Sequence, residues 1–238
     1  TSLTCFIACR IPDKRHILSL EGGYYTTLNI YPPSLLKFPG PAEALNFEER
    51  LLEAAEDNPA PSRALHFWES ATLAVVLGRG NRAETEVKLG TCQLGNLPVL
   101  RRCSGGGAVL LGPGCLNYSL ILPIEQDIKS TNDHVMHRHA QAINGLLPSG
   151  DPRCKVQGCT DLTLDGLKFS GNAQRRLRRQ LLFHGTFLYR FPLELIEQYL
   201  HMPSRQPCYR QQRSHSDFLC KLPLGSDAIM ECIAQVWR

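Results

Sequence analysis

The chain has 238 residues, of which 43% are hydrophobic and 20% are charged. This is the composition of an ordinary globular protein, and it excludes disordered and collagen-like chains. The formal net charge of +4 is too small to indicate nucleic-acid binding by itself, although a mildly basic protein suits an acidic protein partner.

The cysteine content sets expectations about the cellular compartment. The ten cysteines include no Cys-x-x-Cys pair, so a structural zinc site is not expected and none of these residues is assigned as a metal ligand. The first eight residues lack the basic and apolar regions of a signal peptide, and no apolar run is long enough to cross a membrane. We therefore predict a cytoplasmic protein with mostly buried thiols and no membrane contact.

Residues 1–40 show weak periodicity and end in a proline-rich stretch, which predicts an N-terminal extension or linker. Residues 41–238 are expected to form one domain. Its first element is a helix over residues 42–57, because apolar residues recur there at helical spacing and two prolines follow.

Short apolar and β-branched runs separated by glycines predict the strands. These runs cover residues 63–68, 72–77, 97–101, 108–111, 117–122, 161–164, 168–170 and 181–189. Asp165-Gly166 is a strong hairpin signal, and further helices are predicted over 133–147, 193–200 and 227–236, the last with Ser226 as N-cap. Strands joined by short turns favour an α+β fold with a mostly antiparallel central sheet flanked by helices.

A glycine loop, Ser104-Gly105-Gly106-Gly107, lies between two of the predicted strands and follows Arg101-Arg102. Adjacent glycines weaken a sheet, but their bare amides allow phosphate or carbonyl oxygens to approach closely. The pattern matches neither a P-loop nor a dinucleotide-binding fingerprint. Glycine content alone leaves a flexible hairpin and a ligand-binding loop equally possible.

Several blocks of sequence, in the same order, resemble the lipoate-protein ligase A family. They are Asn46-Phe47-Glu48-Glu49, Leu77-Gly78-Arg79, Arg101-Arg102-Cys103-Ser104-Gly105-Gly106-Gly107-Ala108-Val109, Gly114-Cys115-Leu116-Asn117-Tyr118-Ser119, Lys168-Phe169-Ser170-Gly171-Asn172-Ala173-Gln174, His184-Gly185-Thr186 and Arg213-Ser214. Several blocks in register are more specific than any one of them. The resemblance implies that residues 41–238 form an α+β catalytic domain of the kind shared with biotin ligases and octanoyltransferases.

The resemblance also implies a reaction, in which lipoate or octanoate is attached to a lysine of a lipoyl-domain protein through an acyl-adenylate, with ATP and Mg²⁺. It assigns catalysis to Lys168, because a fixed cation would stabilise charge on the α-phosphate and on the acyl carbonyl. Without the flanking motif, a solvated lysine would be the simpler interpretation. The residues implied in binding substrate or nucleotide are Arg102, Ser104, Gly105, Gly106, Gly107, Ala108, Asn117, Asp161, Ser170, Gly171, Ala173, His184, Gly185 and Thr186.

The implied acceptors are the E2 subunits of 2-oxoacid dehydrogenases and the glycine cleavage H protein. The basic run 175–179 is a candidate docking surface for acidic lipoyl domains, and it lacks the interleaved aromatic residues that would favour nucleic acid. Many ATP-using ligases of this family carry a C-terminal accessory domain, whereas only a short segment follows Arg213-Ser214 here. We therefore expect either a separate accessory chain or acyl transfer without adenylation.

Three alternatives remain open. The first is an ATP-independent octanoyl- or lipoyltransferase with a cysteine nucleophile, for which Cys154 and Cys159 lie upstream of Lys168 and Cys154 is preferred. The second is a biotin ligase, since the run 78–82 is superficially similar to a loop of that class, but the glycine loop favours lipoate. The third is a non-catalytic binding protein that has the same fold.

Overall fold

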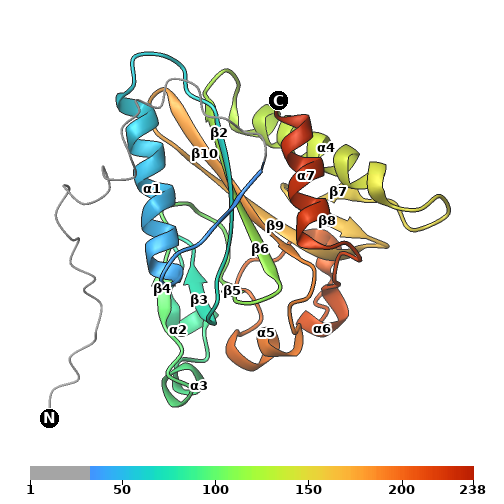
Figure 1. Ribbon diagram of the computed structural model, residues 1–238. Helices are drawn as coiled ribbons and strands as arrows, with labels where there is room; N and C mark the ends of the chain where they lie inside the picture. Colours follow the sequence, from blue (N-terminus) through green and yellow to red (C-terminus); the bar gives the residue numbers. More distant parts are fainter. Residues whose placement is uncertain (1–32) are drawn as a thin grey trace, which may run out of the picture.

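The computed structural model describes residues 33–238, and its centre is a twisted sheet (Figure 1). Within the described part this sheet has seven strands in the order β1-β2-β6-β10-β9-β8-β7. Every neighbouring pair is antiparallel except β1 and β2. The strands are β1 (Leu35–Leu36), β2 (Ala64–Glu69), β6 (Cys115–Pro123), β7 (Lys155–Gln157), β8 (Asp161–Leu164), β9 (Leu167–Arg176) and β10 (Gln180–Leu188).

A second, three-stranded sheet carries the glycine loop. Its strands, in the order β4-β3-β5, are β4 (Val99–Arg101), β3 (Ala74–Leu77) and β5 (Val109–Leu111). The loop joins the two edge strands of this sheet, and two short helices, α2 (Ala83–Glu86) and α3 (Leu89–Leu94), lie between β3 and β4 in the chain. The individual strands are predicted from sequence, but their separation into two sheets is not.

Helices cover both faces of the large sheet (Figure 1). Helix α1 (Pro41–Asp57) packs on one face, where Leu52 contacts the cluster that contains Ile121 and Leu182. Helices α4 (Ile128–Leu146) and α7 (Ser226–Val236) pack on the other, against alternate residues of β6 and β10 such as Leu120 and Phe183. The remaining helical turns are α5 (Glu194–Tyr199), η1 (Cys208–Arg210) and α6 (His215–Phe218).

The central strand β6 is buried on both faces, so its sequence is nearly continuous in apolar residues. Successive side chains on a strand point to opposite faces. Leu116, Tyr118 and Leu120 therefore face α4, whereas Asn117 and Ser119 face α1. Part of the candidate site therefore lies between β6 and α1, where these two polar side chains are found.

Local signals account for many of the elements, with several corrections. Strand β9 runs to Arg176, far beyond the predicted 168–170, and β1 and β7 are not predicted from the sequence. Asp165 (φ 49°) and Gly166 (φ 74°) form the predicted hairpin turn. Helix α4 begins at Ile128 rather than at residue 133, because the Asp127 carboxylate accepts hydrogen bonds from the N–H groups of Lys129 (2.8 Å) and Ser130 (3.0 Å). Ser226 is inside α7, and Gly225 takes the N-cap position. Most of the predicted extension 1–40 lies outside the described residues.

No helix in the part of the chain that the structure describes combines the length and the apolar character needed to cross a bilayer.

Gly114, in the turn before β6, provides a test of backbone geometry. Its φ is +87°, and an added Cβ would lie 2.4 Å from the carbonyl carbon of Arg190. We expect Gly114→Ala to lower the free energy of unfolding by about 1–3 kcal/mol. The control Gly145→Ala, in α4 where a Cβ meets nothing within 4 Å, should raise it by about 0.5–1 kcal/mol. Urea denaturation measures both, and equal stability of Gly114→Ala and wild type would contradict the steric argument.

Candidate active site

A pocket of about 130 Å³ lies where α1, the glycine loop and strands β9 and β10 meet. Its lining contains most of the residues implicated from sequence, namely Arg102, Gly106, Gly107, Ala108, Asn117, Lys168, Gly171, Ala173, His184, Gly185 and Thr186. Four other implicated residues, Ser104, Gly105, Asp161 and Ser170, do not line it but lie beside residues that do. The lining residues that sequence reasoning did not assign are Leu45, Glu48, Trp68, Val76, Val109, Leu111 and Asn172.

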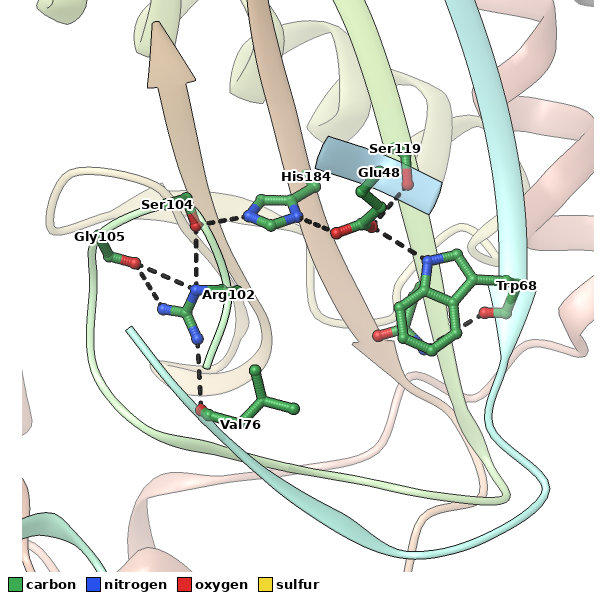
Figure 2. Close-up of polar contacts among 9 residues, drawn as sticks. Glu48, Trp68, Val76, Arg102, Ser104, Gly105, Ser119 and His184 are labelled. Atoms are coloured by element: carbon green, nitrogen blue, oxygen red, sulfur yellow. Dashed lines mark hydrogen bonds and ion pairs between the residues drawn. The ribbon is translucent and has the colours of Figure 1, made fainter. Parts of the chain in front are cut away.

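Arg102 holds the glycine loop in shape instead of projecting freely into the pocket (Figure 2). Its guanidinium donates to the carbonyl oxygens of Gly105 (2.6 Å) and Gly107 (2.9 Å), and at longer range to that of Val76 (3.5 Å). Burial lowers the pKa of Arg102 to about 10, although the charge of Glu48 opposes that shift. The side chain therefore remains cationic at neutral pH and carries positive charge beside the loop.

The glycines of the loop are needed for close approach at one point and leave open space at two others. Gly106 has a φ of +90°, and an added Cβ would lie 2.8 Å from Nη2 of Arg102. At Gly105 and Gly107 a Cβ would meet nothing within 4 Å. The backbone N–H groups of these three glycines donate to no acceptor among the described residues, so they are available to bind an anionic or carbonyl oxygen.

A buried polar network connects α1 to β10 and to the glycine loop (Figure 2). Nδ1 of His184 lies 2.7 Å from Oε2 of Glu48, and Nε2 lies 2.6 Å from Oγ of Ser104. Oε1 of Glu48 accepts hydrogen bonds from Trp68 Nε1 (3.0 Å) and Ser119 Oγ (2.6 Å). Ser104 is fully buried and absent from the pocket lining, so its hydroxyl orients His184 and is not exposed to a substrate.

The ionisation of Glu48 depends on this network. Burial by itself would raise the pKa of the carboxyl group. The charge of His184, with hydrogen bonds from His184, Ser119 and Trp68, outweighs burial and lowers the pKa of Glu48. Glu48 is therefore a buried carboxylate at neutral pH, and it orients His184 at the wall of the pocket.

Lys168 reaches the pocket from β9. Its Nζ lies 2.8 Å from Oδ1 of Asp161, on the paired strand β8. A Cβ added at Gly171 would lie 2.9 Å from both Cε and Nζ of Lys168, so the lysine side chain crosses directly over this glycine. A larger residue at position 171 would displace the ammonium group. The sequence predicted that Lys168 and Asp161 lie on paired strands, but not that they form an ion pair.

Both candidate cysteine nucleophiles lie outside the pocket lining. Cys154 is buried in the core beneath α4, and burial raises the pKa of its thiol to about 12, with Arg153 opposing the shift. Cys159 is exposed in the turn before β8. Because a thiolate is the reactive form, the location and pKa of Cys154 disfavour covalent catalysis there.

Comparisons with known proteins show the family of this chain. Residues 40–223 match the family model of the lipoyl protein ligase A/B catalytic domain. The chain is 29% identical over 141 residues to a probable lipoate-protein ligase A of Mycoplasma pneumoniae, covering 59% of this chain and 40% of that relative. It is 34% identical over 116 residues to an octanoyl-[GcvH]:protein N-octanoyltransferase of Exiguobacterium, covering 45% of this chain and 41% of the relative.

Solved structures share the fold. A bipartite lipoate protein ligase of Thermoplasma acidophilum, described together with its E2 lipoyl domain as an archaeal lipoylation system, superposes with a TM-score of 0.71 at 21% identity, covering 86% of this chain and 82% of the other. A lipoate-protein ligase A bound with ATP gives a TM-score of 0.70 at 20% identity, with coverage of 86% and 83%.

The α+β fold is therefore the one found in these lipoate protein ligases. The family match extends over residues 40–223, so the chain belongs to the lipoyl protein ligase A/B catalytic domain family, whose named relatives are enzymes. The matched region corresponds to about two-fifths of the length of the curated relatives described above.

The pKa of Glu48 leads to a test of the buried network. A carboxyl group whose folded-state pKa lies below its ordinary value of 4.5 stabilises the fold above that value and loses this contribution as the pH falls through the folded-state pKa. We expect Glu48→Gln to reduce the free energy of unfolding by about 3 kcal/mol near neutral pH, because it leaves one partner of a buried pair.

The difference in stability between wild type and Glu48→Gln should shrink as the pH is lowered below 4.5. Chemical denaturation at a series of pH values measures it. Glu49→Gln, at the exposed neighbouring position of the same helix, is the control and should change stability little at any pH. A difference for Glu48→Gln that does not vary with pH would show that the carboxylate charge is not what matters.

Proposed function

We propose that this protein attaches lipoyl or octanoyl groups to a specific lysine of lipoyl-domain proteins, through an acyl-adenylate. The observation that carries the proposal is one pocket in which an apolar wall adjoins unbonded glycine amides and the ammonium group of Lys168. An aliphatic acid needs the first feature, and a phosphate or a polarised carbonyl needs the second.

The apolar wall suits a medium-length acyl chain. Its residues come from α1, β2, β3 and β5, and they are Leu45, Trp68, Val76, Val109 and Leu111. Asn117 and Thr186 add polar groups to the same wall. We propose that the chain of lipoate or octanoate lies along these residues with its carboxylate toward the glycine loop.

The polar side of the pocket suits the adenylate. In the proposed reaction the carboxylate attacks the α-phosphorus of ATP and pyrophosphate leaves. The acceptor lysine amine then attacks the acyl carbonyl, loses a proton and displaces AMP. Lys168 and the amides of Gly105, Gly106 and Gly107 would stabilise the negative charge that develops in both steps. Mg²⁺ would arrive with the nucleotide phosphates.

We propose the E2 subunits of 2-oxoacid dehydrogenases and the glycine cleavage H protein as acceptors. Two similar proteins support this class, since one is a ligase described with its E2 lipoyl domain and the name of the other includes octanoyl-GcvH. In the basic run 175–179, Arg176 donates to the Gln126 carbonyl and Arg179 contacts Glu56. Arg178 is exposed and has no partner among the described residues, so it is the arginine of this run that we propose for contact with an acidic lipoyl domain.

A separate accessory chain and a cytoplasmic location remain predictions.

Transfer from an acyl carrier without ATP is the second candidate, and the similarity to an octanoyltransferase supports it. One experiment separates the two. A purified lipoyl domain is incubated with the protein and either octanoate plus Mg-ATP or an octanoyl-carrier protein, and its mass is measured. We expect an octanoyl mass gain with Mg-ATP. Gain only with the carrier would contradict the ligase version, and gain with neither would contradict acyl transfer altogether.

Lys168→Ala should lower the rate of acyl transfer by a factor that corresponds to about 2.7–4 kcal/mol, because it removes a fixed donor from the developing negative charge. The protein should remain folded, since Lys168 is half-buried at the pocket. Lys155→Ala, an exposed lysine on β7, is the matched control. A near-normal rate for Lys168→Ala in a single-turnover assay would remove this residue from the proposed mechanism.

Cys154→Ala and Cys159→Ser should both retain transfer activity, because neither thiol lines the pocket. The measurement is the rate of mass gain by the acceptor with each acyl donor. Loss of activity in a folded Cys159→Ser variant, with accumulation of a thioester in wild type, would favour the cysteine mechanism instead.

A further inference from the structure

Tyr209 contacts the Asp161–Lys168 ion pair and lies outside the sequence motifs shared with the family. Its phenol oxygen donates a hydrogen bond of 2.7 Å to Oδ2 of Asp161, whose Oδ1 lies 2.8 Å from Nζ of Lys168. We infer that Tyr209 is a positioning residue, which fixes the Asp161 carboxylate and thereby the ammonium group of Lys168. This inference rests on the role proposed above for Lys168.

A neighbouring segment that is hydrogen-bonded to the hairpin bearing Lys168 supports this inference. This segment, residues 207–220, contains η1 and α6. Arg213 Nη2 donates to the Gly166 carbonyl in the hairpin turn (3.2 Å), and the N–H of Cys220 donates to the Lys168 carbonyl (2.9 Å). Together with Tyr209, these contacts hold the turn, the backbone of Lys168 and its carboxylate partner from one side.

Tyr209 is itself held in place. Its ring centroid lies 5.2 Å from that of Phe218, and its carbonyl oxygen accepts a hydrogen bond of 2.9 Å from Arg213 Nη2. The Gly158 turn (φ +59°) also lies against this side chain, since an added Cβ there would lie 3.4 Å from the Tyr209 ring. A phenol with this support can define the orientation of the carboxylate it contacts.

The chemistry of the phenol suits a permanent donor. Burial, and then the charge of Asp161 and the hydrogen bond to it, raise the pKa of Tyr209 above its ordinary value, while Arg213 and Arg210 oppose that shift. The hydroxyl therefore keeps its proton at neutral pH. With Oδ2 occupied by this donor, Oδ1 is the oxygen that faces Lys168.

Loss of the hydroxyl should act on the chemical step and not on binding of the acceptor protein. Without the bond from Tyr209, the Asp161 carboxylate can turn about its side-chain axis and the ammonium group loses its fixed place beside Gly171. Hydrogen bonds to charged groups are worth enough to predict a fall in kcat of about 10- to 100-fold for Tyr209→Phe. The KM for the acceptor domain should change by less than about two-fold, because Tyr209 acts through another side chain.

The test compares Tyr209→Phe with Tyr189→Phe. Tyr189 is also half-buried and also donates to a carboxylate, Glu69 (2.8 Å). Unlike Asp161, Glu69 is not bonded to a residue of the pocket lining, because its other partner is the N–H of Gly114. Both variants keep the aromatic ring, and thermal melts establish that they are folded at the assay temperature. We expect the kcat defect in Tyr209→Phe alone. An unchanged kcat, or an equal defect in Tyr189→Phe, would overturn the inference.

A double-mutant cycle with Asp161→Asn shows whether Tyr209 acts through Asp161. If it does, Tyr209→Phe should cause little further loss of kcat in the Asp161→Asn background. Fully multiplicative losses would overturn the positioning role, because they would show that the two residues act separately.

A readout independent of catalysis separates this inference from the proposed function. Labelling of lysines by acetic anhydride, followed by mass spectrometry, reports how freely Lys168 reacts, with Lys155 as the internal reference. We expect faster labelling of Lys168 in Tyr209→Phe than in wild type. An unchanged rate would overturn the positioning role even if acyl transfer is observed. Absence of transfer by wild type would contradict the proposed function while leaving this result interpretable.

Discussion

The burial of the Glu48 carboxylate is the constraint on which the site depends. A buried charge is costly unless it is paired and hydrogen-bonded, so the segments that satisfy it must lie at fixed positions. Trp68 and Ser119 reach it from β2 and β6, and His184 reaches it from β10. Ser104 extends the network to the glycine loop. One side chain thus connects α1, three strands of the large sheet and the loop that borders the pocket.

Close backbone approach is the second physical requirement of the site. The glycines at 78, 171 and 185 each lie where a Cβ would collide with a group that shapes the pocket. At Gly185 it would lie 1.8 Å from Oδ1 of Asn172, and at Gly78 it would lie 2.1 Å from the Gly106 carbonyl oxygen. The family motifs are therefore rich in glycine for a steric reason as well as for access to ligands. Lys168 depends on the same device, because its side chain crosses over Gly171.

The pocket has a polar side and an apolar wall, and only the polar side can be recognised from sequence motifs. Its polar side is made by the glycine loop and the Lys168 block, which are contiguous runs and therefore recognisable. Its apolar wall comes from isolated residues, such as Leu45 and Trp68, on four separate elements. Family membership rests on the runs, whereas in the proposed function the preference for one acyl chain would depend on the wall. Like the apolar wall, the hydrogen bond from Tyr209 to Asp161 cannot be recognised as a contiguous motif, because the two residues are 48 positions apart.

The sequence by itself determined the local elements, the order of the motif blocks and the presence of Lys168 beside a glycine block. Periodicity predicted α1 and the strands, and Asp165-Gly166 predicted its turn, because both signals depend on neighbouring residues. Periodicity placed Glu48 on the apolar face of α1 but gave no reason for a carboxylate there. Only the tertiary structure shows that this carboxylate pairs with His184, because the two residues are 136 positions apart in the sequence and meet where α1 packs on β10. The same holds for the division into two sheets and for Tyr209, because long-range packing leaves no periodic signal in the chain.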